Sequence, residues 1–213
     1  MPRPRPFDDA FGAELDRLFR WRRDVRHFQG KPLPEGMVAE LVATASLAPS
    51  VGYSQPWRFV QVADAGRRAR IGAIFSACNA EALAAQPAAR AGLYARLKLS
   101  GLAEAPEHLA VFLDGEAPTG GGLGRATMPE TLAFSAVLAI HTLWLAAAAR
   151  GVGLGWVSIL DPAAVGQALE VPAGWRLVAY LCLGYPAEPA ETPELERCGW
   201  ERRIAPSDLL LHR

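Results

Sequence analysis

The sequence predicts one domain in which helices and β-strands share a core. Three segments have the alternating or continuous apolar pattern of strands, at residues 57–62, 108–113 and 175–184. Between the second and the third lies a long segment without charge, residues 131–149, with the composition of a buried helix. A chain of 213 residues has the length of one domain and can bury a sizeable core. We therefore treat residues 1–213 as a single domain.

The uncharged helix is the most distinctive element. Apolar side chains occupy nearly its whole circumference, no charge precedes Arg150, and Gly151 suits the position after a helix end. Such a helix is expected to be buried on all sides. A run of this length can also span a membrane, but it is rich in alanine and contains Ser135 and His141. It also lacks a flank of aromatic and basic residues at each end, so we expect no membrane partner.

Composition excludes several classes of protein. The formal net charge is zero, which gives no electrostatic reason to expect nucleic acid or an anionic membrane surface as a partner. Cys78, Cys182 and Cys198 lie far apart and form no metal-binding or disulfide pattern. The histidines have no zinc-site spacing, so we expect no metal. No apolar segment follows the basic N-terminal residues as in a secretory signal, and we expect a cytoplasmic protein.

A cluster of arginines follows the first predicted helix, residues 8–21. Arg22, Arg23 and Arg26 surround a single carboxylate, Asp24. Such a cluster is commonly a solvated patch with weak ion pairs. The alternative is a site for phosphate or carboxylate, because the planar guanidinium group matches both in a bidentate manner. Pattern alone leaves both interpretations open.

The next segments place a loop before the first strand and helices after it. A helix is predicted from Pro34 to residue 47, and residues 48–57 form a loop with hydroxyl and amide side chains. That loop is either a simple helix-to-strand connection or a binding loop. Residues 64–104 have a helical period with a break at Gln86, but too few large apolar residues for a dense core. We interpret them as peripheral helices that could form a lid.

Two glycine-rich segments resemble nucleotide motifs but do not meet their requirements. Residues 115–124 are not followed by the Gly-Lys-Ser/Thr of a phosphate-binding loop. Gly151, Gly153 and Gly155 follow a helix and open a strand at residues 154–159, the reverse of the dinucleotide-binding order. We interpret these glycines as allowing the backbone to approach a flat group, with residues 156–158 at its edge. A short helix is predicted to begin at residues 161–162.

Several motifs together resemble those of the nitroreductase-like flavoproteins. They are R-R-D-V-R, A-P-S-V-G-x-x-Q-P-W-R-F, L-K-L, G-x-G-x-G-W-V-S-I-L, V-A-Y-L-C-L-G-Y-P and G-W-x-x-R, in this order between residues 22 and 203. The resemblance implies an α+β fold with a mostly antiparallel sheet surrounded by helices. It also implies a homodimer with FMN at the subunit interface. Ser54 and Ser100 depart from the pattern, in the loop and lid segments.

The resemblance is closest to the branch that cuts reduced FMN, with O2, to 5,6-dimethylbenzimidazole, the lower ligand of cobalamin. In that branch NADH or NADPH acts through a flavin reductase, which would be a further partner. Asp24 together with Ser158 distinguishes this branch from ordinary nitroreductases. The resemblance implies the following FMN-binding residues: Arg22, Arg23, Asp24, Val25, Arg26, Ser50, Gln55, Pro56, Lys98, Leu99, Trp156, Val157, Ser158 and Arg202.

The two expected catalytic residues are Asp24 and Ser158. Fragmenting a flavin requires protons to move on and off the ring and side chain, which a carboxylate among arginines can do as a general acid–base. The Ser158 hydroxyl could orient oxygen or relay a proton. Alternatively, Asp24 only pairs with arginine and Ser158 only bonds to backbone. Two other functions stay open: an NAD(P)H-dependent nitroreductase or flavin reductase that retains its FMN, and a non-enzymatic flavin-binding dimerisation module.

Overall fold

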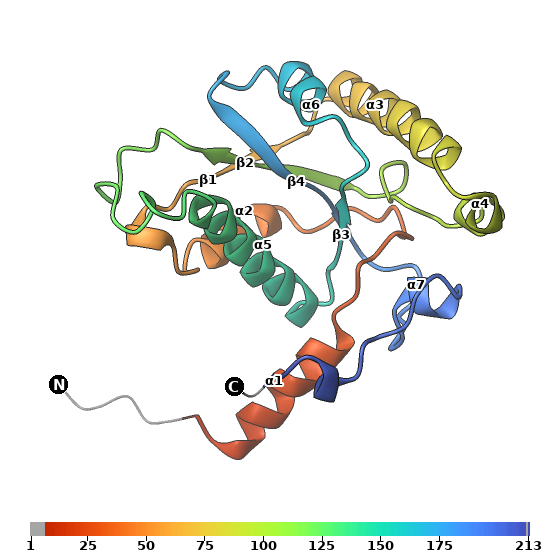
Figure 1. The fold of residues 1–213 in the computed structure, drawn as a ribbon, viewed down its shortest axis with the longest axis horizontal. Coiled ribbons are helices and arrows are strands. Elements are labelled where there is room, and N and C mark those ends of the chain that lie inside the picture. Colours follow the sequence, from red (N-terminus) through yellow and green to blue (C-terminus); the bar gives the residue numbers. More distant parts are fainter. Residues whose placement is uncertain (1–6, 212) are drawn as a thin grey trace.

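A computed structural model describes residues 7–211 and residue 213. These residues form a four-stranded sheet with helices on both faces (Figure 1). The strands are β1 (Trp57–Gln61), β2 (Glu107–Asp114), β3 (Gly153–Val157) and β4 (Trp175–Gly184). Their order is β1-β2-β4-β3, and each neighbouring pair is antiparallel. The α+β fold with an antiparallel sheet is therefore confirmed.

In the described residues, six helices lie within predicted helical segments, but the segment predicted at residues 64–104 is helical only to residue 94, and the short helix at Glu194–Arg197 was not predicted. The helices are α1 (Asp9–Trp21), α2 (Met37–Ala45), α3 (Ala65–Ala84), α4 (Ala88–Tyr94), α5 (Thr131–Ala149), α6 (Pro162–Ala168) and α7 (Glu194–Arg197). Two short 3-10 turns span Val51–Tyr53 and Pro206–Asp208. The second helix begins at Met37 rather than Pro34, because the left-handed backbone conformation of Gly36 is incompatible with a continuous α-helix through that residue.

The sheet separates two cores. Leu109 and Val111 of β2 face the cluster formed with α2 and α5, whereas Ala110 and Phe112 face the cluster formed with α3 and α6. Successive side chains on a strand point to opposite faces, so the continuous apolar run of β2 is explained by burial on both sides. Figure 1 shows α5 and α2 on one side of the strands, with α3 and α6 on the other.

The prediction that α5 is buried on all sides is wrong within one chain. Its core face is fully buried at Ala136, Ile140 and Leu143, but Phe134 and Leu138 remain 53% and 45% exposed. The exposed positions follow the helical spacing, so they form one apolar stripe along the helix. The sheet can cover only the opposite face of α5.

By length and composition, α5 could also cross a membrane. Of its most apolar 18-residue stretch, 44% is buried inside the domain. The buried residues pack against β2, β3 and β4 in the core of the domain. This is the arrangement of a core helix with one open face.

The chain after α1 crosses closely over the outer edge of β3. Asp24 pairs with Leu154 in a parallel bridge, and the Val25 N–H donates to the Leu154 carbonyl at 3.0 Å. A Cβ atom on Gly155 would lie 2.0 Å from the Val25 carbonyl oxygen. The interpretation that Gly155 admits a flat ligand is therefore corrected: it admits the protein's own main chain.

A polar pair lies inside the core between the sheet and α3. His108 is 1% exposed, and its Nδ1 lies 2.9 Å from the hydroxyl of Tyr180, which is fully buried. Burial, followed by the positive charge of Arg68, lowers the pKa of His108 to about 4. Burial also raises the pKa of Tyr180. Both groups are therefore neutral near pH 7 and can share a hydrogen bond.

We expect Gly155→Ala to lower the free energy of unfolding by about 1–3 kcal/mol, because the new methyl group would displace the Val25 carbonyl. Gly72→Ala is the matched control, since its Cβ would meet no atom within 4 Å in α3. That change should stabilise the protein by about 0.5–1 kcal/mol. Urea unfolding at one protein concentration measures both. Equal stability of wild type and Gly155→Ala would contradict the crossing.

We expect the free energy of unfolding to decrease as the pH is lowered, because of His108. Its pKa is about 4 when folded and 6.5 ordinarily, so the unfolded chain binds the extra proton between these values. The contribution is complete above pH 6.5 and declines by about 2 kcal/mol from pH 7.5 to pH 5. His108→Gln should remove this component, which urea unfolding as a function of pH would measure. If the variant kept the same pH dependence of its free energy of unfolding, titratable groups other than His108 would be responsible for it.

Candidate functional site

The arginine cluster begins where α1 ends. The Arg22 N–H donates to the Leu18 carbonyl at 2.9 Å and closes the helix. The Arg23 guanidinium folds back and donates to the carbonyls of Arg20 and Arg22. It thereby satisfies carbonyls at the α1 C-terminus, where cationic groups are favoured. Arg23 Nε is buried and has no hydrogen-bond partner among the described residues.

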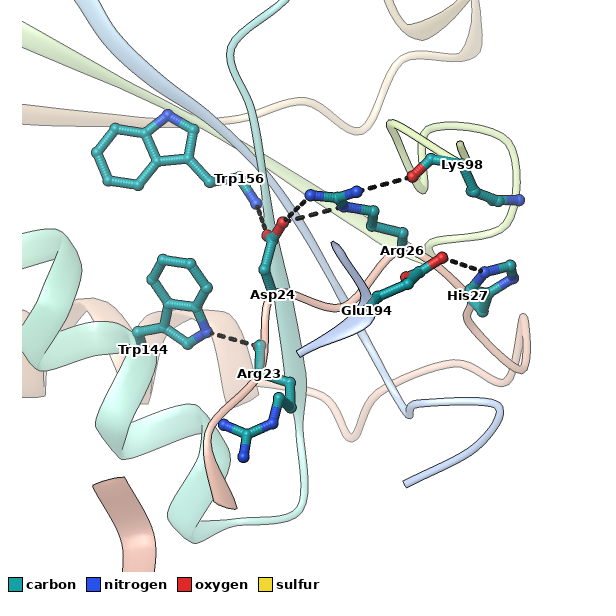
Figure 2. A network of polar contacts seen from close by, with 8 residues as sticks. All are labelled: Arg23, Asp24, Arg26, His27, Lys98, Trp144, Trp156 and Glu194. Carbon is teal, nitrogen blue, oxygen red and sulfur yellow. Dashed lines mark hydrogen bonds and ion pairs between the residues drawn. The ribbon is translucent and has the colours of Figure 1, made fainter. Parts of the chain in front are cut away.

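Trp144 of α5 holds the first two arginines in place. The Arg22 guanidinium carbon lies 4.7 Å from the centre of the Trp144 ring, a cation–π contact. The indole N–H of Trp144 donates to the Arg23 carbonyl at 3.1 Å (Figure 2). Its ring also lies 6.4 Å from that of Trp156 on β3. One aromatic side chain therefore links α5, the arginine segment and β3.

Both carboxylate oxygens of Asp24 accept hydrogen bonds. Oδ1 accepts from the Trp156 backbone N–H at 2.9 Å, and Oδ2 accepts from Nε and Nη2 of Arg26 at 3.0 Å each. The Arg26 side chain is only 13% exposed, whereas that of Asp24 is 32% exposed. Figure 2 shows this carboxylate between β3 and Arg26. Asp24 is thus an arginine partner and a main-chain tether, and its role in proton transfer stays a prediction.

The predicted lid segment joins this network. Nη1 of Arg26 donates to the Lys98 carbonyl at 3.0 Å. The Lys98 ammonium group pairs with Glu104, and Leu99 is half-buried beside it. The chain after α4 is therefore attached to the Asp24–Arg26 pair through its backbone.

The end of β3 presents residues of different burial. Val157 is buried against the α3 and α6 core, and Trp156 packs partly against the α5 core. Ser158 follows the strand and is exposed. Its hydroxyl is therefore accessible at the end of a rigid element, as the prediction requires.

The remaining predicted residues lie elsewhere in the chain. The Ser50 hydroxyl accepts from the Gln55 N–H at 3.1 Å, and the buried Pro56 precedes β1, the opposite edge strand from β3. The adjacent Val51 N–H donates to Ser135, near the start of α5. Ser135 and Trp144 lie roughly 14 Å apart along the helix axis. Within a single chain, this loop therefore lies away from the arginine cluster.

A fourth cation lies near Arg22 and Arg23. Burial lowers the pKa of both groups, and the positive charge of Arg203 lowers each further. Arg23 and Arg203 line one groove of about 1230 Å³ between α1, the end of α5 and residues 191–196. The predicted Arg202 lies beside Arg203 and is exposed. Its own placement on the ligand stays a prediction.

Sequence reasoning missed Trp144 and Arg203. In the sequence, Trp144 counts only as one more apolar residue of the long helix. It is, however, a tryptophan among mostly small and aliphatic residues, and its indole N–H can donate a hydrogen bond. Arg203 belongs to the same closing motif as Arg202, and the spacing G-W-x-x-R points to Arg203. Both residues carry a signal in the sequence, but only the fold shows what each contacts.

Comparison with known proteins identifies the family. The model of the nitroreductase family matches residues 19–185. The chain is 61% identical to a 5,6-dimethylbenzimidazole synthase of Rhodospirillum rubrum, covering 92% of this chain and 93% of that protein. It is 46% identical to a protein of the same name from Rhodobacter capsulatus, covering 93% and 96%.

A solved structure shares the architecture. Oxidised iodotyrosine deiodinase, bound to FMN and 3-iodo-L-tyrosine, matches with a TM-score of 0.66 and 27% identity. The match covers 83% of this chain and 91% of that one. The family match spans the sheet strands β1 to β4 and the segment that carries Asp24. The chain belongs to the nitroreductase family.

Proposed function

We propose that the protein is a 5,6-dimethylbenzimidazole synthase that consumes reduced FMN and O2. The observation that carries this proposal is the 61% identity to the Rhodospirillum rubrum synthase over 92% of the chain. A match over 92% of the chain includes the arginine segment and the end of β3 as well as the scaffold. The geometry supports it, because Asp24 is hydrogen-bonded to the backbone of Trp156, two residues before the exposed Ser158.

The donor set fits a flavin mononucleotide. Besides burial, the charge of Arg203 lowers the pKa of Arg22 and Arg23, and the charge of Arg22 lowers that of Arg23, so an anion among them would relieve their repulsion. The buried Arg23 Nε also lacks a protein partner in the described part of the chain. Guanidinium groups bind phosphate with charge-assisted hydrogen bonds. We infer that these three residues hold the FMN phosphate.

Asp24 and Arg26 would act together beside the ring. When bound, reduced FMN supplies both the electrons for O2 and the carbon skeleton of the product. Arg26 fixes the orientation of the Asp24 carboxylate through two hydrogen bonds, and the Trp156 N–H fixes its other oxygen. Because the carboxylate is still one-third exposed, it can accept a proton and return it. The accessible Ser158 hydroxyl would orient oxygen or relay the proton.

The supply of reduced flavin requires a second activity. We infer that NADH or NADPH acts through a separate flavin reductase, and that this reductase is a partner in solution. A protein that retains its FMN and reduces a second substrate with NAD(P)H is the competing function. Consumption of the flavin distinguishes the two.

A homodimer would complete the site. The open face of α5 is apolar at Phe134, Val137 and Leu138, and obligate interfaces are apolar in this way. A two-fold axis near this stripe would pair two α5 helices in opposite directions. The start of the partner's α5, with its loop containing Ser50 and Gln55, would then lie near the arginine cluster. The two groups of predicted residues would meet between subunits.

We expect Asp24→Asn and Ser158→Ala to lower the product formed per flavin oxidised by at least about tenfold, with smaller effects on FMN affinity. Asparagine keeps an oxygen for the Trp156 N–H but places an amide group near Arg26, so affinity should fall by about tenfold at most. Purified protein, FMN, a flavin reductase, NADH and air are incubated, and dimethylbenzimidazole is measured by chromatography.

Glu170→Gln is the control for these variants. It makes the same change of carboxylate to amide at a residue that pairs with Arg67 at 2.7 Å, away from the arginine cluster. Its yield should equal that of wild type. Full yield from Asp24→Asn would refute the acid–base role. Absence of product from the wild type, with FMN intact after NADH oxidation, would favour the nitroreductase or flavin reductase instead.

We expect Leu138→Arg to dissociate the dimer, because it places a charge in an apolar interface without a partner. The variant should elute as a monomer in light scattering and lose most FMN binding. Leu47→Arg is the control, since Leu47 is 81% exposed after α2 and lies outside the α5 stripe. A wild-type protein that is monomeric and active would rule out the shared site.

A further inference from the structure

Trp200 joins the C-terminal segment to α4. Its ring lies 6.1 Å from that of Tyr94, edge to face, and 5.1 Å from the guanidinium carbon of Arg90. The neighbouring Glu201 pairs with Arg90 at 3.8 Å. The backbone N–H of Trp200 donates to the Leu195 carbonyl at 2.8 Å, which attaches this residue to α7. The C-terminal segment and α4 are thus held together mainly by aromatic and cation–π contacts.

Tyr94 is the point through which α4 is anchored. It is the buried residue of this helix, at 7% exposure. Its hydroxyl donates to Asn79 Oδ1 of α3 at 2.8 Å, and its ring contacts Trp200. α4 has few other contacts with the domain, so loss of the Trp200 ring would leave it attached mainly to α3.

The chain leads from Tyr94 to one part of the candidate site and from Trp200 to another. Four residues after Tyr94, the Lys98 carbonyl accepts from Arg26, which in turn holds Asp24. Three residues after Trp200, Arg203 lines the same groove as Arg23 at the end of α1. A second link joins α7 to the arginine segment, because Glu194 lies 3.2 Å from His27 (Figure 2).

We propose that Trp200 is a positioning residue for the flavin site. Its ring, packed against Tyr94 and Arg90, fixes α4 and so the Lys98 carbonyl that orients Arg26. The same ring contacts tie to α4 the segment that brings Arg203 to the phosphate-binding arginines. Among the described residues, the ring and hydrogen-bond contacts of Trp200 are with Tyr94, Arg90 and Leu195, rather than with Asp24 or the phosphate-binding arginines. The role deepens the proposed function and rests on it, because it assumes that the arginines bind the phosphate of a flavin.

Two measurements on Trp200→Ala test the proposal. The first is affinity for FMN and for riboflavin, which lacks the phosphate, by quenching of flavin fluorescence. FMN affinity should fall about tenfold more than riboflavin affinity, because Arg203 is no longer held near Arg22. The second uses no flavin: trypsin cleavage after Arg90, Arg96 and Lys98, followed by mass spectrometry, should be about tenfold faster than in wild type.

Two further variants separate positioning from general destabilisation. Trp200→Phe keeps an aromatic ring against Tyr94, so both quantities should return to within about threefold of wild type. Arg67→Ala is the control, because it removes an ion pair that attaches the opposite end of α3 to Glu170, two residues after α6. It should change neither the ratio of the two affinities nor cleavage after Arg96 and Lys98.

The outcomes distinguish this proposal from the function itself. Equal losses of FMN and riboflavin affinity, or cleavage accelerated throughout the chain, would overturn the positioning role. So would a Trp200→Ala variant that matches wild type in both measurements. If wild type binds flavin but forms no dimethylbenzimidazole, the proposed function fails while these results still decide the role of Trp200.

Discussion

The crossing of the main chain over Gly155 is the constraint on which the candidate site depends. Any larger residue there would force the two segments apart, because even a methyl group would lie 2.0 Å from the Val25 carbonyl oxygen. The close approach lets Asp24 reach the Trp156 N–H at 2.9 Å and lets Val25 bond to Leu154. A segment that would otherwise be a loop after α1 therefore becomes part of the sheet edge, with its carboxylate at a fixed position.

The arginines around this carboxylate have structural and electrostatic roles at once. Arg23 satisfies carbonyls at the end of α1, Arg26 orients Asp24, and Arg22 stacks on Trp144. Each guanidinium is thereby held in one orientation without a neutralising partner for every charge. Burial and the charge of Arg203 lower the pKa of Arg22 and Arg23. A rigid, crowded group of cations favours an anionic ligand, because binding requires little further ordering of side chains.

The helix α5 connects the core, the site and the open surface. One face fills the core beneath the sheet with Ile140 and Leu143, and Trp144 on its flank holds the arginines. The third face is the apolar stripe around Leu138. A helix that is apolar all round is stable in water only when each face has cover. The sheet covers one face, and the proposed second copy of the chain would cover the other and complete the site.

The sequence by itself determined the local elements and the family. Strand β4 has the predicted bounds, and β1 and β2 differ by one residue at their ends, because apolar alternation is a property of neighbours in the chain. The sequence did not show that Gly155 faces Val25, or that Asp24 bonds to Trp156, 132 residues away. It also missed that α5 keeps an exposed face. Such contacts depend on how distant segments pack against each other, which local periodicity does not encode, and only the tertiary structure decided them.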